Sequence, residues 1–342
     1  MTRLHLRARA MSTSRRPQSR VTLVEVLVGM TLGMVVSAAL LLVFANASAN
    51  GQNVQRVAID VENGRYMAEI LRDELRLAGF MGELSTAGAA FSSPDPCATD
   101  VDPTTFAAAP LTVPTPIRGY TAAEVPGCLA GRSRQAATDA LAVRRLEVAT
   151  TGIASLPGGN TRVYLQSSFC ADDPPVAPLV FSKTPAALTL RNRACNAPNA
   201  ARAYVSRLFF VAACNECGRD TTPTFKRLDL VDGRLVETAL VDGIEHFRLE
   251  YGFDTDDNGS ADVYATVPAA AGAASLWHNV TTLRVHYIVR SVRPNVGAAT
   301  VGTQRFTLGA VGAVDTPNDG FVRRAYTTTI RLENPSSTRE LQ

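Results

Sequence analysis

The sequence has few of the residues and motifs on which enzymes rely. It contains no G-x-S-x-G, H-E-x-x-H or P-loop motif, and only four histidines. His5 lies in the basic N-terminal segment. The other three, His246, His278 and His286, lie on or beside expected strands, where we expect solvated faces. A net charge of +3 over 342 residues gives no electrostatic reason to expect a nucleic-acid partner. We therefore expect a protein that is not an enzyme, binds no nucleic acid and requires no cofactor.

Acidic residues are missing from the start of the chain, where arginines collect. The first 24 residues contain no Asp or Glu, and the arginines before the first apolar run are Arg3, Arg7, Arg9, Arg15, Arg16 and Arg20. Such an excess of positive charge marks the cytoplasmic flank of a membrane segment. We interpret residues 1–20 as a basic leader on the cytoplasmic side.

A single long apolar run follows, from residue 21 to residue 45. Its one formally charged residue is Glu25. As a helix, these residues would extend roughly 37 Å, enough to cross a hydrocarbon core of about 30 Å. The run is longer than the apolar part of a secretory signal, and no second run of this length follows. The pattern predicts one retained transmembrane helix, with everything after about Asn46 in the periplasm.

Residues 46–79 keep a helical spacing but become amphipathic. The apolar positions three and four residues apart are Val54, Val57, Val61, Met67, Ile70, Leu71, Leu75 and Ala78. Charged residues separate them, so we expect one face of this helix to be buried. Gly51 and Gly64 are the places where a bend would cost least, and Gly79 should end the helix.

Residues 80–342 predict a β-rich periplasmic head. Residues 80–135 are rich in Ala, Pro, Thr and Gly and indicate an irregular region. Strand-like runs follow at 140–148, 161–169, 179–183, 187–192, 201–213, 224–231, 234–253, 280–292 and 326–334. They do not alternate with helices, which favours antiparallel pairing. The expected fold class is α+β: a long N-terminal helix, its first half transmembrane, packed on a mainly antiparallel sheet in one head domain.

All six cysteines lie in the periplasmic part, which favours disulfides. Six cysteines allow 15 connectivities, and the sequence does not select one. We favour sequential pairs: Cys97–Cys128, Cys170–Cys195 and Cys214–Cys217. A zinc site at Cys214 and Cys217 would need a second cysteine or histidine pair nearby, so the disulfide is the better interpretation.

Several blocks of the sequence resemble a known family. Val21-Thr22-Leu23-Val24-Glu25 resembles the motif that opens the apolar helix of prepilin-like proteins, with Val21 in place of the usual Phe. The blocks 62–66, 71–82, 241–245, 251–252 and 323–329 are similar to the PilW family of minor pilins. The resemblance does not extend over about 85–200. It implies a pilin-like fold and a cut by the prepilin peptidase between Arg20 and Val21, followed by methylation of the new N-terminus.

Two residues of the N-terminal motif leave alternatives open. Glu25 either sits at a helix start, where the dipole tolerates it, or pairs with the new α-amino group of Val21 during assembly. We favour the pairing. The family's peptidase normally requires glycine where this chain has Arg20. Three outcomes are open: the peptidase tolerates Arg20, it cuts slowly before Val21, or the leader stays uncut.

The segment 254–262, DTDDNGSAD, matches the first nine positions of an EF-hand-type calcium loop. Its expected ligand positions are Asp254, Asp256, Asn258, Ser260 and Asp262. The twelfth position is Ala265 where such loops have Glu, so any Ca²⁺ affinity should be weak. The alternative is a hairpin turn that these residue types favour by themselves.

The resemblance implies a minor pilin that helps to initiate type IV pilus assembly within a minor-pilin complex. The alternatives are a minor pseudopilin of a type II secretion system and a membrane-tethered periplasmic adhesin or binding module. The expected partners are other minor pilins, the major pilin and the prepilin peptidase. The expected location is the bacterial inner membrane, with a periplasmic head, and then the pilus at the cell surface.

Overall fold

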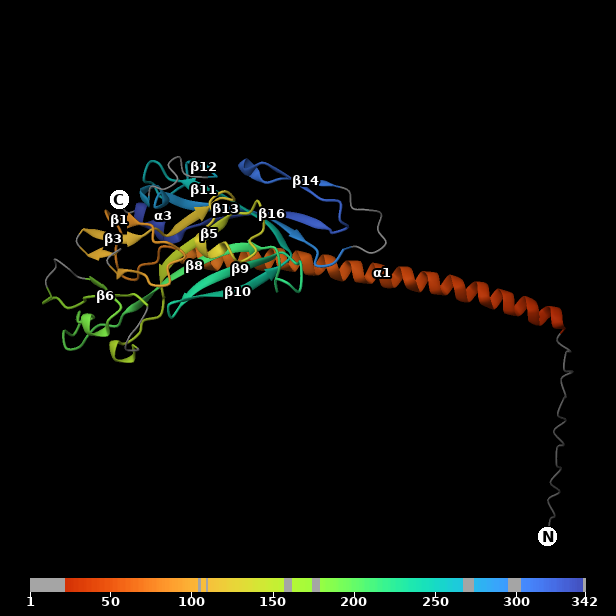
Figure 1. Ribbon diagram of the computed structural model, residues 1–342, viewed down its shortest axis with the longest axis horizontal. Coiled ribbons are helices and arrows are strands. Elements are labelled where there is room, and N and C mark those ends of the chain that lie inside the picture. The colour runs from red at the N-terminus through yellow and green to blue at the C-terminus, as the bar shows by residue number, and fades with distance from the viewer. Residues whose placement is uncertain are drawn as a thin grey trace, which may run out of the picture. The chain divides into compact units, whose positions relative to one another are not determined.

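A computed structural model describes residues 22–103, 106–108, 110–156, 162–173, 179–266, 274–294 and 303–340 (Figure 1). The chain forms two compact units, residues 1–55 and 56–342. The long helix α1 (Leu23–Arg76) contributes to both of them. The basic leader and the peptide bond between Arg20 and Val21 lie outside the described residues.

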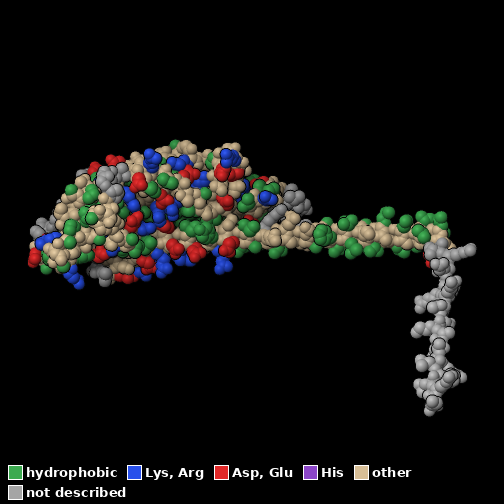
Figure 2. All heavy atoms as spheres, turned by 90° about the horizontal axis from the view of Figure 1, so that it is seen from below, with side chains coloured by type: hydrophobic (Ala, Val, Ile, Leu, Met, Phe, Trp, Pro, Cys, Tyr) green, Lys and Arg blue, Asp and Glu red, His purple; other side chains and the backbone are tan. Residues whose placement is uncertain are grey.

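The part of α1 in the first unit is apolar and uncovered. Each residue from 22 to 48 is exposed to solvent, including large apolar side chains such as Leu41 and Phe44. Its most apolar 18-residue window has a mean hydropathy of 2.5. Among the described residues, one helix is long and apolar enough to cross a membrane. Figure 2 shows hydrophobic side chains along this part of α1.

The larger sheet of the head has seven strands, and five of them follow the order β10-β9-β8-β5-β4. The remaining two, β6 and β7, pair with each other, and β6 also pairs with β8. All of these pairings are antiparallel. The strands are β4 (Ile117–Tyr120), β5 (Ala140–Leu146), β6 (Tyr164–Ser167), β7 (Leu179–Ser182), β8 (Arg202–Ala212), β9 (Thr224–Val231) and β10 (Arg234–Asp242).

A second, four-stranded sheet has the order β12-β11-β13-β16, again antiparallel throughout. Its strands are β11 (Ile244–Phe253), β12 (Val263–Ala265), β13 (Val280–Arg290) and β16 (Arg323–Arg331). The run 234–253, expected as one strand, divides at Gly243 into β10 and β11. Gly243 has a φ of +82°, a backbone conformation that side chains with a Cβ rarely adopt.

Smaller elements complete the head. A three-stranded sheet contains β1 (Ala90–Ser92), β2 (Ala107–Ala108) and β3 (Leu111–Pro114), with β1 and β3 parallel. β14 (Gln304–Thr307) and β15 (Ala313–Thr316) form a hairpin. The short helices are α2 (Ala274–Trp277), α3 (Glu333–Glu340) and the 3₁₀ turns η2 (Gly127–Leu129), η3 (Ile153–Ser155), η4 (Pro185–Ala187) and η5 (Gly309–Val311).

The main core lies where the head part of α1 meets both sheets. Met67, Leu71 and Leu75 of α1, with Ala78 just after it, are 0% exposed and belong to one hydrophobic cluster with side chains from both sheets. Burying each leucine contributes about 1.5–3 kcal/mol. The prediction of a mainly antiparallel head that buries one face of the helix is therefore confirmed.

Gly64 does not have the role that the sequence suggested. It lies inside the continuous helix α1, where the Tyr287 hydroxyl donates a hydrogen bond to its carbonyl at 2.7 Å. A Cβ at this position would be 2.7 Å from the ring of Tyr326, which stacks on Tyr287 with ring centroids 5.3 Å apart. Glycine therefore allows a close approach between α1 and the four-stranded sheet, and it does not mark a bend.

Two expectations about the middle of the chain are wrong. The region 80–135 is more ordered than its composition suggests, because it contains β1 to β4 and η2. The fully buried Arg144 holds part of it through hydrogen bonds to Thr115 Oγ1 at 3.0 Å and to the Pro94 carbonyl at 2.6 Å. The run 187–192 was expected as a strand, but it has only an isolated bridge between Arg191 and Pro198.

His286 is also not on a solvated face. It is 2% exposed, because the turn η5 lies against this face of β13. Its Nδ1 atom is 2.9 Å from Thr327 Oγ1, and its Nε2 atom is 3.3 Å from Glu250 Oε1. Burial lowers the pKa of His286 despite the nearby Glu250 carboxylate. His278 stacks on Phe91, with ring centroids 4.6 Å apart.

Candidate functional sites

The start of α1 is capped by Thr22. The backbone N–H of Glu25 donates to Thr22 Oγ1 at 3.3 Å and to the Thr22 carbonyl at 3.0 Å. Glu25 thus lies in the first turn, where the helix dipole favours a carboxylate. The sequence Thr22-Leu23-Val24-Glu25 also has the T-x-x-E spacing of a capping box, which predicts a helix start independently of the resemblance to prepilin-like proteins. Because Val21 is not described, its pairing with Glu25 stays a prediction.

Small residues follow Glu25 at intervals of four along the same helix. These are Gly29, Gly33 and Ser37, so Gly29 and Gly33 form a G-x-x-x-G pair. A Cβ placed on either glycine would have no atom within 4 Å. Such a face lets another helix approach closely in a membrane. The spacing is visible in the sequence, although it is no part of the N-terminal motif Val21–Glu25.

The acidic loop brings together the three carboxylates among its five expected calcium ligands. The carboxylates of Asp254, Asp256 and Asp262 offer oxygens that lie within 4.8 Å of one another. Asp254 is 0% exposed. Its Oδ2 atom accepts the N–H of Gly259 at 2.8 Å, and its Oδ1 atom accepts the N–H of Asn258 at 3.3 Å.

Two of the five expected ligands, Asp262 and Asn258, also accept hydrogen bonds from within the loop. Asp262 Oδ2 accepts both the N–H and the hydroxyl of Thr255 at 2.8 Å. Asn258 Oδ1 accepts the N–H of Ser260 at 2.8 Å. Ala265, at the twelfth position, lies in β12. These contacts also suit the hairpin-turn interpretation, since they shape the connection between β11 and β12 without an ion.

A buried arginine from α3 lies against this loop. Arg339 donates from Nε to Asp254 Oδ2 at 2.8 Å and from Nη1 to Asn279 Oδ1 at 3.0 Å, and it forms an ion pair with Asp257. Burial raises the pKa of Asp254, but the hydrogen bonds from Arg339 and Gly259 outweigh burial and hold it below its ordinary value. Because a guanidinium repels a cation, it should weaken calcium binding further. The calcium site stays a prediction.

All six cysteines are paired, and the pairs are the sequential ones: Cys97–Cys128, Cys170–Cys195 and Cys214–Cys217. Asp172 lies near the second pair, but sulfur atoms in a disulfide are not available as thiolate metal ligands. The disulfides therefore serve the structure of the head's loops.

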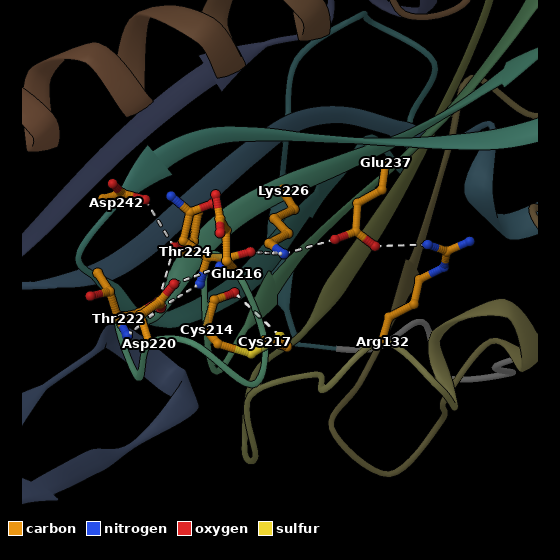
Figure 3. The surroundings of a disulfide bond; sticks show 11 residues. Arg132, Cys214, Glu216, Cys217, Asp220, Thr222, Thr224, Lys226, Glu237 and Asp242 are labelled. Carbon is orange, nitrogen blue, oxygen red and sulfur yellow. Dashed lines mark hydrogen bonds and ion pairs between the residues drawn. A yellow bond between two sulfur atoms is a disulfide. The ribbon is translucent and has the colours of Figure 1, made fainter.

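The turn between Cys214 and Cys217 is held by one carboxylate (Figure 3). Asp220 accepts the backbone N–H groups of Asn215 at 2.9 Å, Glu216 at 2.6 Å and Thr222 at 2.9 Å. The N–H donors lower the pKa of Asp220. This arrangement keeps a small polar turn in one conformation.

Beside that turn, three charged side chains form a chain of ion pairs (Figure 3). Lys226 Nζ donates to the Asn215 carbonyl at 2.8 Å and to Glu237 Oε1 at 2.7 Å. Arg132 donates to the second oxygen of Glu237, also at 2.7 Å. These contacts join the η2 region, β9 and β10, and they give the CxxC segment a structural setting.

A long apolar N-terminal helix followed by a mainly antiparallel α+β head is the arrangement of a pilin-like protein that a membrane can anchor. The family model described as Type IV Pilus-assembly protein W, PilW, matches residues 208–334, from β8 to the start of α3. This match confirms the resemblance to the PilW family. The blocks 241–245, 251–252 and 323–329 lie within the matched range, whereas the blocks 62–66 and 71–82 and the N-terminal motif precede it.

Among solved structures, the chain is similar to a type IV-like pilin from Thermus thermophilus, with 12% sequence identity and a TM-score of 0.28. The alignment covers 58% of this chain and 78% of that one. No curated protein matches the chain significantly.

Proposed function

We propose that this chain is a minor pilin that helps to initiate type IV pilus assembly within a complex of minor pilins. The observation that carries the proposal is the uncovered apolar surface of α1 from residue 22 to residue 48, in a chain whose head matches the PilW family. A surface of this kind is stable only in lipid or against other apolar helices. Lipid would cover it before assembly, and helices of neighbouring subunits would cover it afterwards.

In this proposal Glu25 directs the transfer from lipid to fibre. A carboxylate in the apolar part of a membrane costs up to about 2.5–3.5 kcal/mol, and less near the membrane surface. Cleavage between Arg20 and Val21 would create an α-amino group that can pair with Glu25 of the same or a neighbouring subunit. The small face formed by Gly29 and Gly33 would allow the helices to approach.

The proposed partners are other minor pilins, the major pilin and, during processing, the prepilin peptidase. The proposed location is the inner membrane with the head in the periplasm, and later the pilus at the cell surface. The role is structural: the chain would act by packing and pairing, without catalysis.

The test is deletion followed by complementation. Loss of surface pili after deletion, restored by the wild-type gene, supports the proposal. Loss of a secreted enzyme with normal pili would instead indicate a pseudopilin, and intact pili with lost adhesion would indicate a tethered binding module. Co-purification with other prepilin-like subunits gives an independent measure of assembly.

Glu25→Val tests the pairing, and Glu62→Val is its matched control. Both remove a glutamate from α1, but Glu62 is an exposed residue outside the apolar run. We expect Glu25→Val to remain in the membrane yet fail to co-purify with partner pilins, and Glu62→Val to co-purify normally. Normal assembly of Glu25→Val would refute the pairing.

A further inference from the structure

Strand β10 lies at one end of the seven-stranded sheet, and its outer edge is unpaired in the described part of the chain (Figure 1). A two-residue turn joins it to β9, so Val231 and Arg234 form the first hydrogen-bonded pair. Such pairs alternate along the two strands. Leu235, Glu237 and Ala239 therefore direct their backbone N–H and C=O groups away from β9. No described residue bonds to these groups.

This edge lacks the protection of the other edge strands in the two large sheets. β4, β7 and β12 have only three or four residues, and β16, as long as β10, carries the exposed Arg324 and Arg331. Short length and exposed charge hinder the addition of another strand. β10 has nine residues and no proline. Its central charge, Glu237, is already neutralised by Lys226 and Arg132, each at 2.7 Å (Figure 3).

An open groove lies beside one end of this edge, between β10 and α1. Its volume is about 440 Å³. Ile59 and Tyr66 of α1 line it, together with Leu240 of β10 and with Val292. Ile59, Tyr66 and Val292 are 53%, 50% and 42% exposed, so the groove leaves large parts of these side chains in water. Covering them would be favourable.

Most polar groups of the groove already have partners. Asn63 Nδ2 donates to the Asp242 carbonyl at 3.2 Å, and the Asp242 carboxylate accepts the Thr224 hydroxyl at 2.9 Å. The Asn215 carbonyl accepts Lys226 Nζ at 2.8 Å. What the groove offers to a ligand is therefore its apolar side chains and the side-chain amide of Asn215.

An extended polypeptide would satisfy the edge and the groove at once. Its backbone can exchange hydrogen bonds with the outward groups of β10, as an added strand does. Every second side chain of such a strand faces the α1 side of the sheet. Val236 lies on that face, 45% exposed, because the bulge at Leu240 keeps it on the same face as the core residue Val241. A lipid chain would fill the groove but leave the backbone groups unpaired.

The charge on β10 argues against a second copy of this chain as the added strand. Antiparallel pairing of two β10 strands over their full outward rows would place the two copies of Glu237 directly opposite each other. Like charges in that position destabilise a sheet. The occupant is therefore a strand of a different polypeptide, with an uncharged residue opposite Glu237.

We propose that β10 binds an extended segment of another protein as an additional strand of the sheet. The segment exchanges backbone hydrogen bonds with Leu235, Glu237 and Ala239. It carries apolar, β-branched side chains at every second position, and one of them enters the groove beside Ile59 and Tyr66. This goes beyond the proposed function, because strand addition involves the head alone and requires neither the apolar helix nor cleavage of the leader.

The test uses the full chain in nanodiscs of phosphatidylcholine, with empty nanodiscs as the reference. The probe is the fluorescein-labelled peptide Lys-Val-Thr-Val-Thr-Val-Lys, and binding is measured by fluorescence anisotropy. In the proposed pairing the threonines bond to β10 and the valines face α1. N-methylation of both threonines removes donors to β10 and should weaken binding at least tenfold. N-methylation of the first two valines removes N–H groups that point away from β10, so binding should stay within twofold. Equal binding of the two methylated peptides would overturn the proposal.

Matched variants locate the binding on β10 and the groove. Leu235→Pro removes one outward N–H, and an edge strand tolerates proline at such a position. We expect binding about tenfold weaker, whereas Leu235→Val, which keeps this N–H, should bind like the wild type. Ile59→Asn should weaken binding about fivefold. Val54→Asn, at an exposed position of α1 that does not line the groove, should leave it unchanged.

The outcome stays decisive if Leu235→Pro folds poorly, because the methylated peptides are compared on the wild-type protein. Self-association of the wild type that Leu235→Pro abolishes would identify a second copy as the occupant and refute the proposal. Loss of pili on deletion, together with equal binding of the methylated peptides, would refute this inference alone. Selective peptide binding by a protein whose deletion leaves pili unchanged would refute the proposed function and leave this inference standing.

Discussion

Replacing Asp60 with asparagine should stabilise the head at neutral pH. Asp60 lies on α1 and is 4% exposed. Burial raises the pKa of its carboxyl to about 6, although the charge of Arg324 opposes the shift. The native protein therefore holds a proton on this carboxyl more tightly than the unfolded chain does, and ionisation at higher pH opposes folding.

The pKa sets the size and sign of the effect. The rise from 3.8 to about 6 is about two pKa units, and each unit corresponds to 1.36 kcal/mol. The full shift is thus worth about 3 kcal/mol, and solvent that reaches the carboxylate reduces it, so we expect about 1.5–3 kcal/mol. The stabilisation from the protonated Asp60 is complete below pH 3.8 and is lost as the pH rises through about 6.

The assay is urea unfolding between pH 4 and pH 8, followed by tryptophan fluorescence. Trp277 is the only tryptophan, it is 4% exposed, and it packs edge-on against Tyr251, so it reports on the head. Asp60→Asn should exceed the wild type in unfolding free energy at pH 8, with a difference that shrinks toward pH 4. Asp73→Asn, at an exposed position on the same helix, is the control and should show no such trend. A difference independent of pH would refute the reasoning.

Three further predictions concern other parts of the chain. Gly64→Ala should lose about 1–3 kcal/mol of stability, because the new methyl group meets the Tyr326 ring, whereas Gly51→Ala, with no atom within 4 Å, should leave the urea midpoint of the head unchanged. N-terminal sequencing of the mature protein should find a chain that begins at Val21, and a retained leader would show that the peptidase does not accept Arg20. If the dissociation constant is about 1 mM, calcium at 10 mM should raise the melting temperature of the wild type by a few degrees, and Asp256→Asn should abolish this rise. An unchanged melting temperature of the wild type would show that the loop 254–262 is a hairpin turn that does not bind calcium.

The sequence indicated the outline of the fold because its strongest signals are local. Leu283, Val285 and Tyr287 alternate with Arg284 and His286 within the expected strand 280–292, and all three apolar side chains belong to the core beside α1. Asp232-Gly233 is the two-residue turn of the β9–β10 hairpin, and both residues have positive φ, as that turn requires.

Features that depend on contacts between distant residues were missed. The ordered strands between residues 90 and 120 are held by Arg144, whose partners lie 29 and 50 residues away, and no local pattern encodes that distance. Burial of His286 depends on η5, which follows it by more than 20 residues. The role of Gly64 likewise depends on the close approach of Tyr326, whereas the sequence showed only a glycine at which a bend would cost least.

In the candidate sites, too, local sequence features could be predicted and contacts between distant residues could not. The motif containing Glu25 and the spacing of the acidic loop were visible in the sequence. The charge that opposes calcium was not visible, because Arg339 lies 77 residues beyond Asp262 in the sequence and reaches the loop only in the folded head. The groove between α1 and β10 is likewise assembled from segments between Ile59 and Val292.

The disulfides have a consequence for the order in which the chain matures. Their partners are 31, 25 and 3 residues apart, and the three pairs follow one another along the chain without overlapping. If the head is exported to the periplasm as proposed, with its N-terminal side first, each cysteine pair is complete before the next pair begins. If the cysteines are oxidised in the order in which they cross the membrane, the native set of pairs forms out of the 15 possible sets. The direction of translocation would then determine which cysteines pair.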